Sequence, residues 1–197
     1  MRYAYLDTET TGLHPGNDKG EIIEIAIINV DDGMMEKWVT KIKPQHIETA
    51  HPKALEINGY NADAWKDAPT FEEIAPEIHR RLNGAIVVGH NVNFDLKFLD
   101  HHFNDSAKRM GHSLRLSHRN IIDTVTLAQE HLRPTGLKSV SMDNIRRWLG
   151  WSLNDAHTAL KDADDVRKLH NTLHQAGWLK RWWWSWRGPK NMQKTQK

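Results

Sequence analysis

Asp7 and Glu9 lie two positions apart in the run Asp-Thr-Glu-Thr-Thr-Gly, directly after an apolar segment. If residues 3–7 form a strand, side chains two apart project from the same face, so the two carboxylates converge on one point. Oxygen ligands of this kind suit a hard divalent cation. A turn after a strand is the alternative, because Asp, Thr and Gly are common in turns. This pair alone does not decide between the two interpretations.

Asp95 ends the run Gly-His-Asn-Val-Asn-Phe-Asp at residues 89–95, which follows the apolar residues 86–88. Ligand sites in open α/β sheets form at the ends of strands. An acid in the first turn of a helix also complements the helix dipole. For Asp95 taken alone, this second interpretation is the simpler one.

His157 and Asp162 lie five positions apart in the run His-Thr-Ala-Leu-Lys-Asp. On one helix this spacing separates the side chains by about 140°. We therefore expect His157 in a loop or first turn, capped by Asn154 or Asp155, and Asp162 on the helix that follows. Taken alone, the spacing is more typical of a solvated acidic helix face. Taken together, the three segments occur in order at strand ends or helix starts and supply four acids and one histidine.

Strands and helices alternate around these segments, which predicts an α/β fold. The first three strands follow one another closely enough to form an antiparallel meander. Thr70 is placed to cap a helix, with Glu73 at the capping-box position. The predicted strands span residues 3–7, 22–30, 38–42, 85–88 and 121–122, and the predicted helices span residues 71–82, 94–99, 125–131, 140–149 and 156–176.

The chain of 197 residues is divided here into one domain at 1–179 and a basic, tryptophan-rich tail at 180–197. The tail holds six of the 27 Lys and Arg residues and no acid, so 21 basic and 25 acidic residues remain, a net charge of −4. An acidic body repels a polyanion unless bound cations reverse the local charge. Cysteine is absent, which excludes disulfides and thiolate metal sites. Because no signal-peptide or membrane-spanning pattern is found either, we expect a cytoplasmic protein.

The three segments together resemble the motifs of the DEDD exonuclease superfamily, in its histidine-containing branch (DEDDh, DnaQ-like), which includes polymerase proofreading subunits and RNase T. The resemblance spans residues 3–170. It implies an RNase H-like mixed sheet, with an antiparallel meander followed by parallel strands, flanked by helices. It also implies 3′–5′ exonuclease activity that releases nucleoside monophosphates from DNA or RNA. The implied partner is nucleic acid with a free 3′ end, expected to be single-stranded.

The resemblance assigns roles to individual residues. Two divalent cations, Mg²⁺ or Mn²⁺, are the implied cofactors. Asp7 would bridge both ions, Glu9 and Asp162 would hold the ion that activates water, and Asp95 would orient the other. His157 would act as the general base that takes the proton of the water.

A second set of residues is placed by the resemblance beside the 3′-terminal nucleotide. Leu13 would contact the base, and backbone amides of its loop would lie near the 3′ hydroxyl. Residues 58–60, Asn-Gly-Tyr, depart from the His-Gly-Ile of many members, which leaves the substrate open. Asp123 resembles a recurrent family position, and we interpret it as a helix cap. The predicted substrate-binding residues are Thr10, Thr11, Gly12, Leu13, His90 and Asn91.

The alternative function is a non-catalytic module that binds strand ends. Such a module would be expected to lack a metal ligand, whereas all five motif residues are present. A proofreading or trimming subunit of a larger nucleic-acid-processing complex would share the chemistry and add a protein partner. His170 and His174 could share a helix face and bind zinc, but no third ligand is apparent, so a surface pair is the preferred interpretation.

Tryptophan and arginine side chains gather in the tail. They could stack on the bases of a single strand, pack on the domain, dock a protein partner or rest in a membrane interface. Packing or partner docking is the preferred interpretation. The residues concerned are Trp182, Trp183, Trp184, Trp186, Arg181 and Arg187.

Deleting residues 180–197 is expected to change the affinity for substrate or partner far more than the chemical step, because the motifs end at Asp162. If the tail binds the strand, truncation will raise the half-saturating substrate concentration and flatten its salt dependence, since phosphate contacts are salt-sensitive. A salt titration of single-strand binding, with Ca²⁺ replacing the catalytic metal, measures both effects. Identical affinities and salt slopes would exclude strand binding, and a clearly lower Tm would place the tryptophans in the core.

Overall fold

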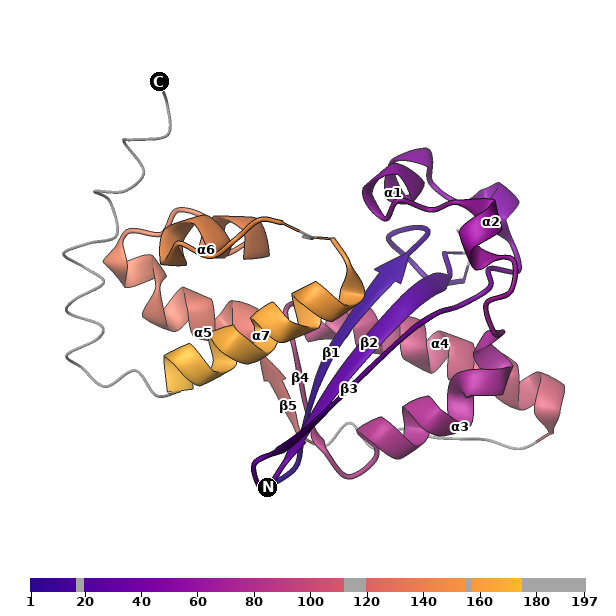
Figure 1. Ribbon diagram of the computed structural model, residues 1–197, viewed down its shortest axis with the longest axis horizontal. Helices are drawn as coiled ribbons and strands as arrows, with labels where there is room; N and C mark the ends of the chain where they lie inside the picture. The colour runs from indigo at the N-terminus through magenta and orange to yellow at the C-terminus, as the bar shows by residue number, and fades with distance from the viewer. Residues whose placement is uncertain (17–19, 112–119, 155–156, 175–197) are drawn as a thin grey trace.

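A five-stranded mixed sheet with helices on both faces forms the centre of the molecule (Figure 1). The computed structural model describes residues 1–16, 20–111, 120–154 and 157–174. The strands are β1 (Tyr3–Thr10), β2 (Ile22–Asp31), β3 (Met34–Lys41), β4 (Ile86–Gly89) and β5 (Ile121–Asp123), in the order β3-β2-β1-β4-β5. The helices are α1 (Pro52–Ile57), α2 (Ala62–Trp65), α3 (Phe71–Leu82), α4 (Val92–Met110), α5 (Thr124–His131), α6 (Met142–Leu149) and α7 (Ala159–His174), with short 3-10 turns at Ile47–Thr49 and Arg133–Thr135.

β1 is the central strand of the sheet. It pairs antiparallel with β2, from Tyr3 opposite Val30 to Thr10 opposite Ile22, and parallel with β4. β3 is antiparallel to β2, and β5 is parallel to β4. The predicted meander and the mixed sheet are therefore confirmed. The register of β1 and β2 shifts between Glu9 and Thr10, and irregularities of this kind redirect side chains at functional sites.

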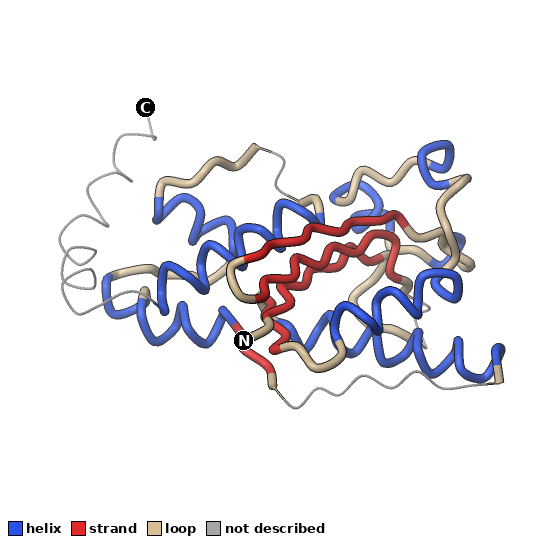
Figure 2. The backbone as a smooth tube through the Cα atoms, turned by 60° about the horizontal axis from the view of Figure 1, so that its bottom comes forward, coloured by secondary structure: helices blue, strands red, loops and turns tan. Residues whose placement is uncertain are grey.

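The alternation of side chains along β1 divides the core into two layers, one on each face of the sheet. Figure 2 shows the helices that cover the two faces. Leu6 belongs to the apolar cluster that α3 and α4 cover. Tyr5 belongs to the cluster on the opposite face, together with Val166 of α7. Asp7 and Glu9 continue the series of Tyr5, so their side chains leave the strand on the face that α7 covers.

α5 and α6 extend the layer formed by α7. A further apolar cluster joins the three helices through Ala128, Ile145 and Leu169. Figure 1 shows α6 lying over α5 and α7, away from the sheet. α6 contacts the site region through α7, because Arg146 of α6 donates a hydrogen bond to Asp162 of α7.

The region between β3 and α3 contains two helices that the sequence analysis did not predict. α1 and α2 have six and four residues, too few for a hydrophobic periodicity to show. Local contacts hold them instead. The side chains of His51 and Asn61 cap the two helices, and the Trp65 indole donates a hydrogen bond to the Ile23 carbonyl at 2.7 Å.

Some predicted boundaries need correction. β1 continues to Thr10 because β2 pairs with it beyond Asp7. α3 begins at the predicted capping box of Thr70 and Glu73. α7 begins at Ala159, so Asn154 lies too far ahead of the helix to cap it, and the other predicted cap, residue 155, lies outside the described residues.

No helix in the described part of the chain is long and apolar enough to cross a membrane. Residues 180–197, including Trp182–Trp184, Trp186, Arg181 and Arg187, lie outside the described residues. The domain boundary and the role of the tail therefore stay predictions.

Gly89 ends β4 immediately before α4. A Cβ atom at this position would lie 2.7 Å from the Cβ of Val92, so Gly89→Ala is expected to displace the first turn of α4, which carries Asp95. We expect the free energy of unfolding to fall by about 1–3 kcal/mol and divalent-cation binding to weaken. Denaturant unfolding and calorimetric titration with Mn²⁺ measure the two effects.

Gly84→Ala is the matched control for this substitution. Gly84 has a φ of +75° with open space around it, so a side chain there strains the backbone without contacting α4. It should lower stability and leave the Mn²⁺ affinity unchanged. A Gly89→Ala protein with the parent's Mn²⁺ affinity would contradict the placement of Asp95 by this close packing.

Candidate active site

Three carboxylates meet where β1 ends and α7 begins. Asp7 and Glu9 project from β1 and Asp162 from the first turn of α7, and one oxygen of each lies within 4.8 Å of the other two. All three side chains are partly buried. Strand alternation sets the first two on one face, and the packing of α7 on that face adds the third. The sequence-predicted ligands Asp7, Glu9 and Asp162 are thus brought together.

Asp95 approaches the same strand from the other side. It is buried in the first turn of α4 and accepts a hydrogen bond from the Thr8 hydroxyl at 2.7 Å. Thr8 lies between Asp7 and Glu9 on β1 and points to the opposite face. This one hydrogen bond therefore ties the fourth carboxylate to the strand that carries two of the others.

His90 and Asn91 hold the junction between β4 and α4. The two ring nitrogens of His90 lie 2.9 Å from the Thr124 hydroxyl and 2.9 Å from the Val140 carbonyl. The backbone N–H of Asn91 donates to the Asp123 carboxylate at 2.9 Å, and Asp123 also caps α5, as predicted. These contacts give His90 and Asn91 a structural role at the edge of the site, and their contact with substrate stays a prediction.

Burial and repulsion by neighbouring acids raise the pKa values of Asp7, Glu9 and Asp95. Burial, with contributions from Asp162 and Glu24, raises the pKa of Glu9 to about 8. Burial raises the pKa of Asp95 to about 7, and burial together with Asp95 and Asp162 raises that of Asp7 well above its usual value. Ionising all of these groups requires a compensating positive charge. The donor set therefore fits divalent cations that prefer carboxylate oxygens.

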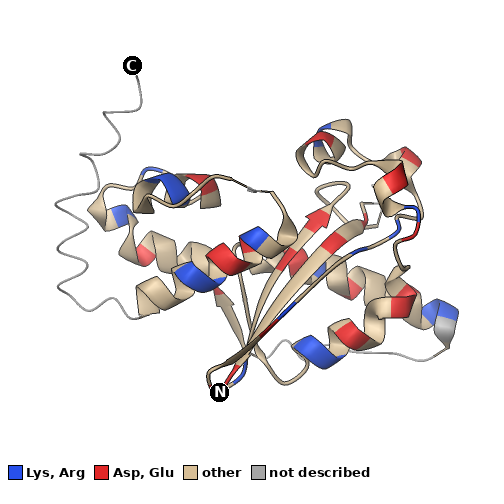
Figure 3. Cartoon of the chain, viewed as in Figure 1, with Lys and Arg blue, Asp and Glu red and all other residues tan. Residues whose placement is uncertain are grey.

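Glu24 is a residue of the site that the sequence analysis missed. It lies directly opposite Glu9 on β2, and its carboxylate accepts a hydrogen bond from the backbone N–H of Ala159 at the start of α7. Figure 3 shows acidic residues at this end of β1 and β2, beside the first turn of α7. In the sequence, the signal for Glu24 is a single acid within the largely apolar segment that forms β2. Glu24 fastens the beginning of α7 to the sheet.

Arg146 of α6 was missed as well. Its side chain is buried, and its guanidinium donates hydrogen bonds to Asp162 at 2.5 Å and to Asp143 at 2.9 Å. The pair Arg146-Arg147 in a polar helix gives no sequence signal of burial. The burial follows from the packing of α6 on α7, which the sequence does not reveal.

His157 lies in the loop immediately before α7, as predicted. Its φ is +69°, a left-handed conformation that is unfavourable for a residue with a side chain and is found at functional positions. The imidazole is half exposed, and its Nε2 lies 3.8 Å from an Asp143 oxygen, beyond hydrogen-bond distance. The structure therefore places His157 beside α6 and α7, outside the group whose ligand atoms lie within 4.8 Å of one another.

A groove of about 730 Å³ begins at Glu9 and runs between the end of β1 and α1. This volume is typical of a small-ligand site. Its apolar lining includes Ile57, Phe94 and Leu13, and the Leu13 side chain is 77% exposed. The predicted substrate-binding residues of the β1 loop all line this groove, namely Thr10, Thr11, Gly12 and Leu13.

Thr10 and Thr11 connect the groove to neighbouring segments through hydrogen bonds. The Thr11 N–H donates to the Glu21 carbonyl at 2.9 Å, and its buried hydroxyl accepts from the Glu21 N–H at 2.9 Å. Asn58 donates from its side chain to the Thr10 carbonyl at 2.8 Å, so the segment that departs from the family ties α1 to β1. The Thr11 amide is therefore engaged within the protein, while Leu13 is exposed to the groove.

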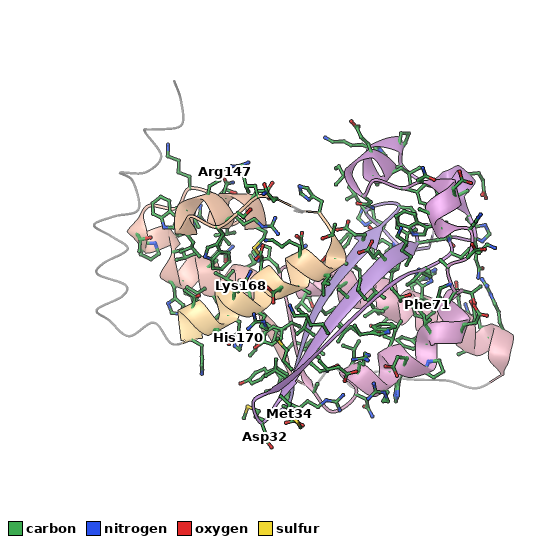
Figure 4. All side chains as sticks on the ribbon, viewed as in Figure 1. Asp32, Met34, Phe71, Arg147, Lys168 and His170 are labelled. Atoms are coloured by element: carbon green, nitrogen blue, oxygen red, sulfur yellow. The ribbon has the colours of Figure 1, made fainter. Side chains whose placement is uncertain are left out.

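His170 and His174 belong to a different region. Figure 4 shows His170 on α7. His170 is buried, and its Nδ1 lies 3.0 Å from the Tyr5 hydroxyl, so the expected surface pair is wrong for this residue. Among the described residues, the group of acids and histidines placed to hold a metal contains Asp7, Glu9 and Asp162 and neither of these histidines.

A known family matches the chain over this whole region. The sequence model of the RNase_T family, described as Exonuclease, matches residues 5–169. The chain belongs to this exonuclease family. The expected DEDDh, DnaQ-like membership and 3′–5′ exonuclease class are thereby confirmed. Enzymes of this family depend on divalent metal ions.

Two relatives show how the chain compares with longer proteins. The DNA polymerase III subunit epsilon of Treponema pallidum is 31% identical over 174 residues, which is 88% of this chain and 76% of that subunit. The PolC-type DNA polymerase III of Thermotoga petrophila is 35% identical over 162 residues, which is 82% of this chain and 11% of that protein. The chain thus corresponds to most of the first relative and to a small part of the second.

The fold is shared with E. coli exonuclease I. The structure of that enzyme in complex with a dA16 oligonucleotide has a TM-score of 0.67 and 22% identity, covering 87% of this chain and 41% of exonuclease I. The RNase H-like arrangement of a mixed sheet flanked by helices is therefore confirmed.

The raised pKa values predict that divalent-cation binding strengthens with pH. Metal ions bind deprotonated carboxylates, and the pKa values of Asp95 and Glu9 are about 7 and about 8. Affinity for Mn²⁺ or Ca²⁺ is therefore expected to rise as the pH passes through these values, with proton release on binding. Calorimetric titration in two buffers of different ionisation enthalpy counts the released protons.

The stability of the metal-free protein should change in the opposite direction. The pKa values of Glu9 and Asp95 are raised by folding, so their protonated forms favour the folded state at low pH, and this contribution is lost as the pH rises through about 7 and 8. Saturating Ca²⁺ should restore the Tm, with a larger shift above pH 8 than near pH 6. Glu9→Gln should reduce the proton release, and a pH-independent affinity would contradict this assignment.

Proposed function

We propose that this chain removes nucleoside monophosphates from the 3′ end of single-stranded DNA. The observation that carries the proposal is the position of Glu9, which belongs to the carboxylate cluster and also lines the groove. A strand end lying in the groove would have its last phosphodiester beside the carboxylates. The groove would thus bind the leaving nucleotide while the cluster carries the chemistry.

Asp7, Glu9, Asp95 and Asp162 would hold two divalent cations, Mg²⁺ or Mn²⁺. When bound, such a pair supplies a hydroxide nucleophile and neutralises the charge of the leaving oxygen. The pKa of Asp7 responds to Asp95 on one side and to Asp162 and Glu9 on the other. From this central position, Asp7 would hold the cations together with the other three carboxylates. Asp95, fixed by Thr8, would then complete the coordination on the α4 side.

His157 would accept the proton of the attacking water at a ring nitrogen. Its position in the loop before α7 allows the imidazole to turn while the helix keeps Asp162 in place. Asp143, with an oxygen 3.8 Å from His157 Nε2, is close enough to orient the ring after a small movement. His157 in the loop would thus transfer the proton, while Asp162 on the helix would bind metal.

Apolar side chains in the groove support a base contact that tolerates any sequence. Leu13, Ile57 and Phe94 line the groove next to Glu9, and contacts to the flat face of a base do not depend on base identity. DNA as substrate is supported by the relatives, which are DNA polymerase III proteins. Exonuclease I, which shares the fold, has been solved with dA16 and dT13 oligonucleotides.

Replacing the ligands and the base should have different consequences. Asp7→Ala and Asp162→Ala are each expected to abolish nucleotide release, because each removes a ligand of the cations. His157→Ala should slow hydrolysis by about 10²- to 10⁴-fold and leave metal affinity almost unchanged. Single-turnover rates and calorimetric titration measure these effects. A ligand variant with near-parental turnover would refute the two-cation site, and lost metal affinity in His157→Ala would make His157 a ligand.

Polarity and substrate class are tested with end-labelled DNA and RNA, single- and double-stranded, in the presence of Mg²⁺. We expect release of mononucleotides from a free 3′ hydroxyl of single-stranded DNA. A 3′-phosphorylated strand should resist, because Glu9 and the loop of residues 10–13, which line the groove, would enclose the 3′ hydroxyl and leave no room for a further phosphate. Cleavage of a closed circular single strand would contradict exonuclease action, and faster release from RNA would overturn the proposed substrate.

A further inference from the structure

The guanidinium of Arg146 joins the carboxylate cluster to the helices behind it. It donates to Asp162 at 2.5 Å through Nη2, to Asp143 at 2.9 Å through Nη1 and to Asp165 at 2.8 Å through Nε. The side chain of Arg146 is 1% exposed. All three partners are acids, and one of them is a proposed metal ligand. A buried arginine with each part of its fork engaged is held in a single orientation.

Asp165 anchors this arrangement from α7. It is completely buried, and it is also ion-paired with Lys161 and with Lys168 at 3.2 Å. If Arg146 were replaced, Asp165 would keep two cationic partners. Within the described residues, Arg146 is the side chain that donates to the Asp162 carboxylate, so the orientation of Asp162 depends most on Arg146.

We propose that Arg146 is a positioning residue that sets the orientation of Asp162 for cation binding. This inference rests on the proposed role of Asp162 as a metal ligand. A carboxylate has two oxygens, and a hydrogen bond to one of them fixes the direction of the other. The Asp162 oxygen Oδ1 is bound to Arg146, which orients the carboxylate toward the cluster with Asp7 and Glu9.

Two features argue that the guanidinium is a fixed part of the site. It cannot leave easily, because burial and its bonds to Asp143 and Asp165 hold it in place. Its charge is shared among three acids, so it does not act as a free cation that competes for Asp162. Loss of partners that orient a metal ligand typically weakens metal binding or activity by about 10- to 100-fold.

Arg146→Lys is the main test, since it keeps a positive charge beside the buried Asp165. A single ammonium cannot hold three carboxylates at fixed angles. We expect the half-saturating Mn²⁺ concentration to rise about 10- to 100-fold and turnover at saturating Mn²⁺ to fall. Arg146→Met should show the same changes more strongly. Mn²⁺ titration by calorimetry, single-turnover rates and the Tm are measured for each variant.

Two arginines serve as matched controls. Arg81 is also buried and forms an ion pair with Glu36 at 2.7 Å, but it lies near the beginning of β1, where Arg2 donates to its carbonyl. Arg81→Met should lower the Tm and leave Mn²⁺ affinity unchanged. Arg147, the exposed neighbour of Arg146 on α6 that Figure 4 labels, should change neither when replaced by Met.

Parental Mn²⁺ affinity and turnover in Arg146→Lys would overturn the proposal. Tighter Mn²⁺ binding would overturn it too, because the guanidinium would then compete with the cation. Asp162→Asn distinguishes this outcome from a failure of the proposed function. If Asp162→Asn keeps metal affinity and turnover, the ligand set itself is wrong. If it loses both while Arg146→Lys keeps both, only the role of Arg146 fails.

Discussion

The carboxyls of Asp7, Glu9, Asp95 and Asp162 repel one another in a space that water reaches only in part, and burial is the first cause of the raised pKa values of Asp7, Glu9 and Asp95. Full ionisation of this group without cations would be unfavourable, so the fold must hold the acids together against their repulsion. It does so by placing two of them on the central strand, which is paired on both sides. The remaining two come from helices packed on opposite faces of that strand.

α7 needs to be held firmly, because its first turn must stay against the sheet beside other carboxylates. Tyr5 and Ala26 of the sheet pack with Ala163 of α7, which fixes the axis of the helix. Glu24 accepts from the first N–H of α7 and uses the partial positive charge of the helix start. Arg146 then fixes the Asp162 side chain itself. Apolar packing, a hydrogen bond to the backbone and an ion pair thus together hold the beginning of α7 in place.

The elements that local patterns define could be predicted from the sequence. The capping box at Thr70 and the apolar β2 segment appear where their patterns indicate, and the convergence of Asp7 and Glu9 follows from strand alternation alone. Glu24 and Arg146 could not be found in this way, because their roles arise from pairing and packing between distant segments. α1 and α2 escaped prediction because capping contacts, and not periodicity, define such short helices.

At the end of β1, the acidic side chains and the apolar side chains have different roles. Asp7, Glu9 and Asp162 meet where β1 ends and α7 begins, whereas Leu13, Ile57 and Phe94 line the groove. Apolar contact with a base adds binding energy without placing further charge near the phosphodiester. The Asn58 bond to the Thr10 carbonyl holds the two walls of the groove at a fixed separation. A strand end can therefore be gripped by its terminal base while the acidic cluster, which would repel a polyanion alone, is reserved for cations.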